Sequence, residues 1–574
     1  MYILKKTPRA HGLHEPFRHE NHERPVTRRQ LLGAGFLSGG AMVMAPAWLG
    51  ALLKAQVAEA QAGNPTLDPT AIGKLTTECA LQGGGNTAAM GTTGPVPFIT
   101  IDLAGGANLM GSEAIAGMAG KPTNFISAAG FSKLGIPGSM VPTSTAFIDM
   151  SLGLPFHSDS AILRGIKLKA SATALAKVNG VVIPAISQND TNSNPLNAMY
   201  YIAKAVQQLP PVGTSTLPPP YGQYATLIGT NATPSGGNSV APKDSIDPTL
   251  QPTRIASSTD NTGLVGNAPG VASQASVDIL QSQARISTGI TPAGAKMTDA
   301  TPATFTGSQV FGSTLVSTTS EVALGATGTM ATAATADAAL KEQLRCAYVK
   351  NAFTAANSKG PDSVNPDKDP LIVTGANAIF TATDYTDGDV KKTAAVMKLV
   401  MNGFAGAGTI VLGGYDYHSG NRADGETKNQ HAGLIIGAII AYADAVATPV
   451  MINIISDGSL TSTGNADSST AGRGKLGWQG DSQQVASSII LVYSPKGRPA
   501  AAINQIGSLN ADGTVNATSS PGANAPNLVP QIVALNWLAL NGISDATVFQ
   551  KVIPTQGLGA AAAQAALTAF TKIT

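Results

Sequence analysis

Short, continuous apolar runs alternate along the chain with longer segments in which apolar residues recur every three or four positions. Each run is bounded by glycine, proline or polar residues, and five of them cover residues 96–102, 178–187, 408–414, 449–457 and 486–495. Such runs predict strands that are buried on both faces. The segments with helical spacing cover residues 195–209, 335–357, 389–405, 428–447 and 528–542. This alternation predicts an α/β fold with a largely parallel central sheet flanked by helices.

The predicted strands form one domain over residues 95–574, interrupted by a segment of different character. Residues 210–334 are rich in Ser, Thr, Gly and Pro, which predicts a loop-rich insertion or cap, with disorder as the alternative for parts of it. Residues 63–94 are turn-rich and without period, and they predict a flexible lead-in.

The composition is typical of a protein with a large globular core, and it does not indicate a nucleic-acid partner. The chain has 574 residues, of which 43% are hydrophobic and only 12% charged. Its 36 basic and 34 acidic side chains give a formal net charge of +2. This balance, together with the absence of a helix-turn-helix pattern or a basic stripe, argues against a nucleic-acid partner.

The first 62 residues read as a targeting segment. Arg28 and Arg29 stand directly before an apolar stretch, in a pattern that resembles a twin-arginine export signal. Small residues at Ala60 and Ala62 suit cleavage after residue 62. The alternative is a membrane anchor over residues 31–53, which are long enough to span a bilayer but are diluted by Gly and Ala. We therefore expect a periplasmic or secreted protein without an integral membrane span after cleavage.

Two cysteines, Cys79 and Cys346, remain after cleavage. In an oxidising compartment they could pair, and the sequence leaves that question open. Neither belongs to a CxxC motif, so a zinc–thiolate site is not expected.

Acidic residues follow three of the predicted strands, at Asp102, Asp416 and Asp457. In parallel α/β sheets ligands bind beyond the carboxyl ends of the strands, so the fold could bring these acids to one edge. Asp416 is followed two positions later by His418, and both would face one side if the strand continued. A carboxylate and an imidazole are good ligands for zinc, manganese or iron. A polar turn without a ligand is the alternative.

Histidines are scarce outside the leader, which holds four of the seven. The three that remain are His157, His418 and His431. His157 is either a ligand or part of a helix start, where Ser158 and Asp159 could supply the cap. His431 is expected to pack or cap near the start of the helix over residues 428–447.

The order of these motifs resembles the domain of unknown function 1501 family, exported bacterial proteins grouped with the alkaline phosphatase and sulfatase superfamily. The first block is IDLAGGANLMG at residues 101–111, and the central one is GGYDYH at residues 413–418. SDGSL at residues 456–460 and GWQGDSQQ at residues 477–484 stand where the third and fourth blocks belong. The resemblance covers about residues 95–499, and only its central block is specific.

The resemblance implies an alkaline phosphatase-like fold and a site for one or two divalent metal ions. The implied metal ligands are Asp102, Asp416, His418 and Asp457, with Asn108, His157 and Asp481 as additional candidates. The motifs also depart from the family pattern. Leu109 occupies the position of an expected acid, and Asp481 is followed by Ser482 instead of histidine. A hard ion such as calcium or magnesium suits the surviving acids.

These departures favour a non-catalytic exported protein with a degenerate metal site and a binding or envelope role. The alternative is a divalent-metal-dependent hydrolase of phosphate or sulfate esters. In that alternative Asn108 orients the substrate, and a metal-activated water attacks because no serine or threonine can be named as nucleophile. A surface adhesin would suit the composition but would leave the motif order unexplained.

Overall fold

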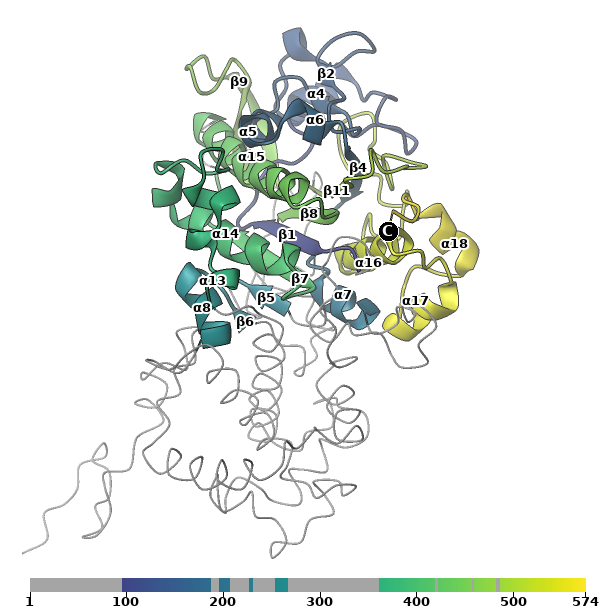
Figure 1. Ribbon diagram of the computed structural model, residues 1–574. Coiled ribbons are helices and arrows are strands. Elements are labelled where there is room, and N and C mark those ends of the chain that lie inside the picture. The colour runs from purple at the N-terminus through teal and green to yellow at the C-terminus, as the bar shows by residue number, and fades with distance from the viewer. Residues whose placement is uncertain are drawn as a thin grey trace, which may run out of the picture.

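The structure is a computed structural model, shown in Figure 1. It describes residues 95–186, 196–206, 227–230, 253–266, 361–418, 422–456, 459–481 and 486–573. The predicted signal, the lead-in, both cysteines and the predicted helix at 335–357 lie outside the described residues.

A seven-stranded sheet forms the centre of the molecule, in the order β4-β11-β8-β1-β7-β5-β6. The strands are β1 (Phe98–Leu103), β4 (Val178–Ala185), β5 (Leu227–Gly229), β6 (Thr253–Arg254), β7 (Ala407–Leu412), β8 (Val450–Ser456) and β11 (Ala486–Tyr493). Only β11 runs antiparallel to its neighbours, β8 and β4. The prediction of a mixed α/β fold with a mostly parallel sheet is therefore confirmed.

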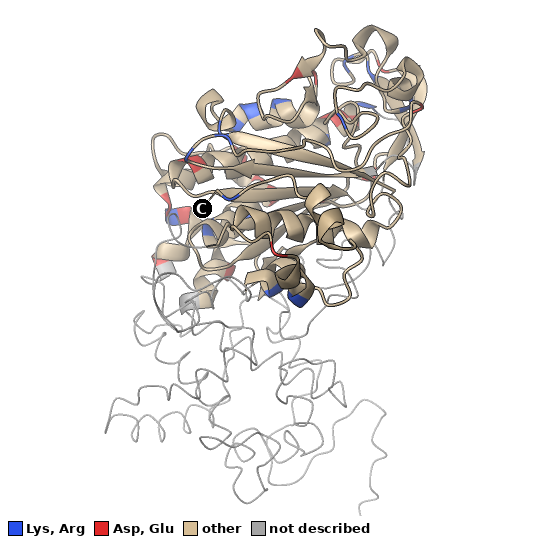
Figure 2. Ribbon diagram, turned by 90° about the vertical axis from the view of Figure 1, so that its right-hand side faces the viewer, with Lys and Arg blue, Asp and Glu red and all other residues tan. Residues whose placement is uncertain are grey.

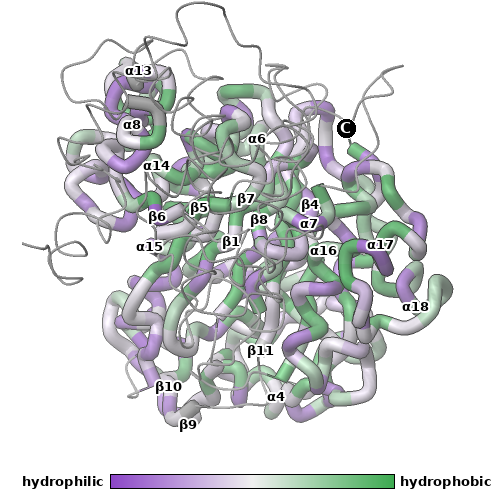
Figure 3. Tube along the Cα trace, turned by 90° about the horizontal axis from the view of Figure 1, so that it is seen from below, coloured by the Kyte–Doolittle hydropathy of each residue, from purple (hydrophilic) through white to green (hydrophobic). Residues whose placement is uncertain are grey.

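The central strands are buried along their whole length. Every residue of β1, β4 and β8 is buried, as expected of parallel strands with both faces covered. Figure 3 shows the hydrophobic colour following much of these strands through the middle of the molecule. Acidic and basic residues of both signs are spread over the surrounding helices and loops (Figure 2).

Helices cover both faces of the sheet and enclose two hydrophobic cores (Figure 1). On one face lie α5 (Ala161–Lys169), α14 (Gly388–Met401) and α15 (Arg422–Ala445), whose apolar residues pack with Ile99 and Ile101 of β1. On the other lie α7 (Met199–Val206) and α16 (Val529–Leu540), which pack with Phe98 and Met451. Alternate residues of β1 therefore serve opposite cores.

Smaller elements decorate this frame. They are α4 (Ala128–Lys133), η2 (Gly138–Met140), β2 (Ile148–Asp149), β3 (Phe156–His157), α6 (Ala172–Leu175), α8 (Ser258–Gly266), α13 (Pro361–Val364), η10 (Pro366–Lys368), η11 (Pro370–Thr374), η12 (Asp384–Thr386), β9 (Leu460–Ala466), β10 (Leu476–Asp481), η13 (Pro526–Leu528), α17 (Ala546–Val552) and α18 (Ala561–Ala566). Strands β9 and β10 form a separate antiparallel pair, as do β2 and β3.

Part of the expected insertion belongs to the sheet. Strands β5 and β6 and helix α8 lie between residues 210 and 334, and β5 pairs in parallel with β7. A strand of three residues in a segment rich in Ser, Thr and Pro carries too little apolar pattern to be recognised. Among the described residues, no helix combines the length and apolarity needed to cross a membrane.

Helices α5 and α15 touch backbone to backbone through glycines. A Cβ atom at Gly433 would lie 2.0 Å from the carbonyl oxygen of Ile162, and one at Gly165 would lie 2.0 Å from that of Gln430. At Gly437 the corresponding distance, to the carbonyl of Ile166, is 2.4 Å. Only residues without a Cβ permit this approach. The contact fixes the middle of α15 against α5.

We expect Gly433→Ala to lower the free energy of unfolding by about 1–3 kcal/mol, the usual cost of overpacking a tight contact. Alanine has a higher helix propensity than glycine, so propensity alone would stabilise the variant. A loss of stability would therefore report the close contact between α5 and α15. The measurement is urea denaturation at equilibrium. Gly138→Ala is the matched control, because a Cβ there meets nothing within 4 Å. A Gly433→Ala protein as stable as the wild type would contradict the close contact.

Candidate functional site

Three neighbouring strands present their carboxyl ends at one edge of the sheet. Strand β1 pairs in parallel with β7 on one side and with β8 on the other. The loops that follow β1 and β7 therefore leave the sheet side by side, in the region where ligands bind in α/β folds. These loops carry Asn108, Asp416 and His418.

The loop after β7 is irregular. The strand ends at Leu412, and the Tyr415 N–H donates to the Ala104 carbonyl at 3.0 Å. Gly105, with φ of +133°, lies so close that a Cβ there would be 2.4 Å from the Asp416 nitrogen. The side chains of Asp416 and His418 contact each other through Oδ1 and Nδ1, with 43% and 42% of their surfaces exposed. The two residues thus meet at the surface because of a loop and not because of strand alternation.

Two buried tyrosines anchor this loop from below. The Tyr417 hydroxyl accepts the Asn108 N–H at 2.9 Å and donates to Asn429 Oδ1 at 2.9 Å. The Tyr415 hydroxyl donates to the Lys428 carbonyl at 2.8 Å. Burial raises the pKa of both phenols, so they stay neutral donors. The first turns of α15 therefore position the loop that carries Asp416 and His418.

Asp102 lies within β1, between Val411 and Ile455 of the neighbouring strands, and is 2% exposed. It shares a face with Thr100, whose hydroxyl donates to Asn197 Oδ1 at 3.1 Å just before α7. Asp102 thus belongs to the face that α7 covers. It forms no common group of ligand atoms within 4.8 Å with Asp416 and His418.

Asn108 is fully buried and held from three sides. Its backbone N–H bonds Tyr417, its Oδ1 accepts from Ser112 Oγ at 2.8 Å, and its carbonyl accepts from Asn429 Nδ2 at 3.3 Å. Within the described part of the chain its Nδ2 has no hydrogen-bond partner. The residue fixes the loop after β1.

Both ring nitrogens of His157 are engaged. Nδ1 accepts the Asp159 N–H at 3.1 Å, and Nε2 lies 2.9 Å from the Met140 carbonyl, which assigns the proton to Nε2. Burial lowers the pKa of His157, and its ring stacks on Phe147. The cap of α5 comes from Ser160, whose Oγ accepts the Leu163 N–H at 3.0 Å. Both ring nitrogens of His157 therefore bond groups of the protein, and His157 forms no common group of ligand atoms with Asp416 and His418.

The structure does not describe the side chains of two predicted site residues. Asp457 lies outside the described residues. Asp481 ends β10, and its side chain is likewise outside the described part.

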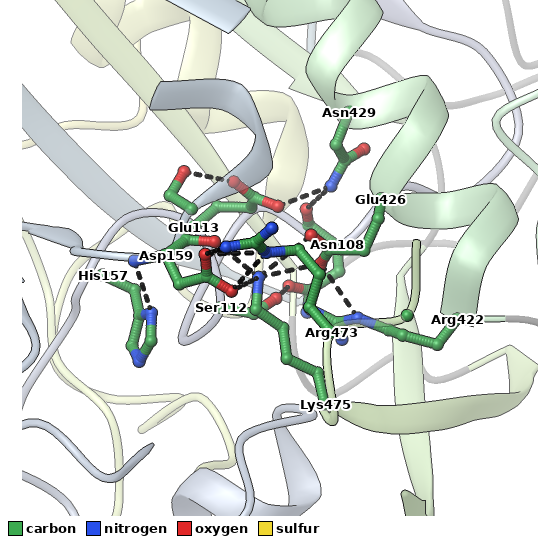
Figure 4. A network of polar contacts seen from close by, with 12 residues as sticks. Asn108, Ser112, Glu113, His157, Asp159, Arg422, Glu426, Asn429, Arg473 and Lys475 are labelled. Carbon is green, nitrogen blue, oxygen red and sulfur yellow. Dashed lines mark hydrogen bonds and ion pairs between the residues drawn. The ribbon is translucent and has the colours of Figure 1, made fainter. Parts of the chain in front are cut away.

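A buried network of charges lies where α5, α15 and the β9–β10 pair meet (Figure 4). Lys475 is fully buried, and its Nζ contacts Glu426 Oε1 at 2.9 Å and the Asp159 carbonyl at 2.6 Å. Arg422 donates to Glu426 Oε1 at 2.7 Å and stacks on Trp478. Burial alone would raise the pKa of Glu426, but the charges of Arg422 and Lys475 outweigh it and hold that pKa below its ordinary value.

Glu113 connects this network to the loop after β1. Its carboxylate accepts from Ser160 Oγ, from the Ile162 N–H at 2.9 Å and from Asn429 Nδ2 at 2.9 Å. Burial, reinforced by the charge of Glu426, raises the pKa of Glu113. Sequence reasoning missed this residue. Its one signal is that Glu113 stands alone as an acid in the apolar, glycine-rich segment 109–118.

One group of side chains in the described residues could hold a metal ion, and it was not predicted. Asp387, Asp389 and His431 each offer a ligand atom, all within 4.8 Å of one another. Asp389 Oδ2 lies 3.5 Å from His431 Nε2, and its Oδ1 contacts Lys392 at 2.7 Å. Because α15 begins at Arg422, His431 stands in its third turn and pairs with α14 instead of capping the helix.

The Asp387–Asp389–His431 group is close to the loop after β7. The Tyr415 hydroxyl in this loop bonds the carbonyl of Lys428, which stands about one turn before His431 on α15. The N-terminus of α14 therefore approaches the same edge of the sheet as Asp416.

Comparisons of the chain with protein-family models, with curated proteins and with solved structures give no match. The class that the fold itself defines is a mixed α/β protein with a mostly parallel sheet.

The His431–Asp389 pair predicts a pH-dependent contribution to stability. The hydrogen bond to Asp389 raises the pKa of His431. Its contribution is therefore fully present below the unfolded pKa of about 6.5 and is lost as the pH rises through the folded pKa. We expect His431→Gln to cost about 0.5–1 kcal/mol more at about pH 5.5 than at about pH 8.5, in the range of partly exposed ion pairs.

Urea denaturation of the two proteins at both pH values measures this difference. Asp387, Asp389 and Lys392 face the imidazole. The cycle is therefore repeated in an Asp389→Asn background, where the pH dependence should become smaller because only Asp387 still favours the charged imidazole. The same loss at both pH values would show that the imidazole is not charged by this pair.

Proposed function

We propose that the chain is a divergent member of the domain of unknown function 1501 family with an alkaline phosphatase-like fold, and that it is exported to bind a ligand or an envelope component without catalysing hydrolysis. The mostly parallel sheet and the position of GGYDYH after a central strand support the family and fold assignment. The twin-arginine pattern at Arg28 and Arg29 supports export.

The positions and contacts of the candidate ligands are what support the non-catalytic assignment. Asp102 lies on the face covered by α7, Asp416 and His418 pair with each other at the surface, and His157 uses both ring nitrogens. A catalytic metal centre needs about three protein ligands that converge on one ion and leave a position open for water. The side chains named by the resemblance do not converge in this way among the described residues.

A metal-dependent hydrolase is the second candidate, and the Asp387–Asp389–His431 group favours it. This group stands near the loop that carries Asp416 and His418, because that loop bonds α15 about one turn before His431. An ion held there would lower the pKa of bound water and polarise a phosphate or sulfate oxygen.

Metal content and hydrolysis together test the two candidates. Mature protein is dialysed against zinc, manganese or calcium, desalted and examined by elemental mass spectrometry, with p-nitrophenyl phosphate and p-nitrophenyl sulfate as substrates. We expect no turnover, and no bound metal that depends on Asp416 or His418. The variants are Asp416→Ala, His418→Ala and His431→Gln, each checked for folding by circular dichroism.

Two results would reverse this assignment. One equivalent of metal lost in Asp416→Ala and His418→Ala, together with lost hydrolysis, would establish a catalytic centre at GGYDYH. Metal and hydrolysis lost only in His431→Gln would instead place the centre between α14 and α15. Metal bound there without turnover agrees with the binding role.

Export depends on the arginine pair in this proposal. We expect Arg28→Lys/Arg29→Lys to leave the full-length protein in the cytoplasm, because twin-arginine signals are read by a receptor that requires the pair. Cell fractionation and immunoblotting measure the distribution. Lys5→Arg/Lys6→Arg is the control, since it alters basic residues elsewhere in the same leader. Unchanged export of the Arg28→Lys/Arg29→Lys protein would argue for another route or for an anchor.

A further inference from the structure

A cavity of about 770 Å³ lies beside β4, the outermost strand at one end of the sheet. The segment that follows β11 runs parallel to β4 here: the Val182 N–H donates to the Asn504 carbonyl, and the Ile506 N–H to the Val182 carbonyl, both at 3.0 Å. Gly507 and Ser508 therefore stand level with the end of β4. These two lining residues place part of the cavity at the edge of the sheet where the parallel strands end, and α/β folds bind ligands at this edge.

The cavity has one hydroxyl-bearing wall and one apolar wall. Ser508, Thr518, Ser519 and Ser520 line the first, and residues of α18 with Ile506 line the second. None of the fourteen lining residues is ionisable. A charged ligand would therefore lose its hydration without gaining an opposite charge.

Ser520 has unused hydrogen-bonding capacity at this cavity. Its Oγ is shielded from solvent and makes no hydrogen bond within the described part of the chain. Gly507, with φ of +91°, lets the neighbouring backbone come close, since a Cβ there would lie 3.1 Å from this oxygen. A hydroxyl without a partner is unfavourable in a buried position. Because Ser520 itself lines the cavity, its hydroxyl is the candidate partner for a hydroxyl of a ligand there.

We propose that this cavity binds a neutral saccharide of one or two sugar units. Its volume falls in the range of small-molecule sites. Ring hydroxyls of the sugar meet the serine and threonine wall, and its C–H face lies on the alanine side chains of α18 and on Leu567. The site is separate from the Asp416–His418 loop, so the proposal is independent of the metal question.

The test is isothermal titration calorimetry of the mature protein with glucose, N-acetylglucosamine and maltose at millimolar concentration. Glucose 6-phosphate is the charged counterpart. We expect at least one neutral sugar to bind and glucose 6-phosphate not to bind. Ala566 lines the cavity and is exposed, so Ala566→Phe should fill the space and abolish binding. Ser520→Ala should weaken it about tenfold, as one lost hydrogen bond does.

Ser139→Ala is the matched control, an exposed serine distant in sequence from the cavity. No binding of any of the three sugars would overturn the proposal. Equal binding of glucose and glucose 6-phosphate would also overturn it, as would binding that both Ala566→Phe and Ser520→Ala leave unchanged. Circular dichroism and urea denaturation establish that each variant is folded, and Ser520→Ala decides the matter should Ala566→Phe fail to fold.

Discussion

The fully buried ammonium of Lys475 constrains the whole region below the candidate site. A lysine in this position requires partners, and it finds them in Glu426 of α15 and in Asp159 before α5. Arg422 and Arg164 share Glu426, and Arg473 binds Asp159. These charges come from three segments of the chain, and the first and last of them, around Asp159 and Lys475, are more than 250 residues apart in sequence. Removing one partner would leave a buried charge, at a typical cost of about 3–5 kcal/mol, so these segments are ordered together.

Hydrogen bonds between uncharged groups connect this buried charge network to the loops at the edge of the sheet. Asn429 stands one turn beyond Glu426 on α15 and links Glu113 to Tyr417. Tyr417 in turn holds the backbone of Asn108. The close glycine contacts of α5 and α15 keep the helices at the separation that this chain of contacts needs. The surface loop with Asp416 and His418 therefore rests on a buried polar support that its own sequence motif does not reveal.

The sequence predicts the elements well, because apolar runs and helical spacing are local. The strand around Asp102, the strand that ends at Ser456 and the helix around His431 are examples, although the helix begins six residues earlier than expected. Side-chain direction is less predictable. Asp102 is the last residue but one of β1. Because side chains alternate along a strand, that of Asp102 lies on the sheet face that α7 covers. The support around Glu113 and Lys475 escapes prediction entirely, since only tertiary contact joins residues so distant.

The edge of the sheet thus separates two requirements that a catalytic centre must combine. Glu113 and Asn108 are rigidly held but closed to solvent. Asp416 and His418 are open to solvent, and their side chains contact each other. A reactive group has to be held in place and still present an unsatisfied atom to the substrate. In the proposed binding role, the exposed Asp416 and His418 at GGYDYH would meet a polar ligand, while the buried residues hold the loop in place.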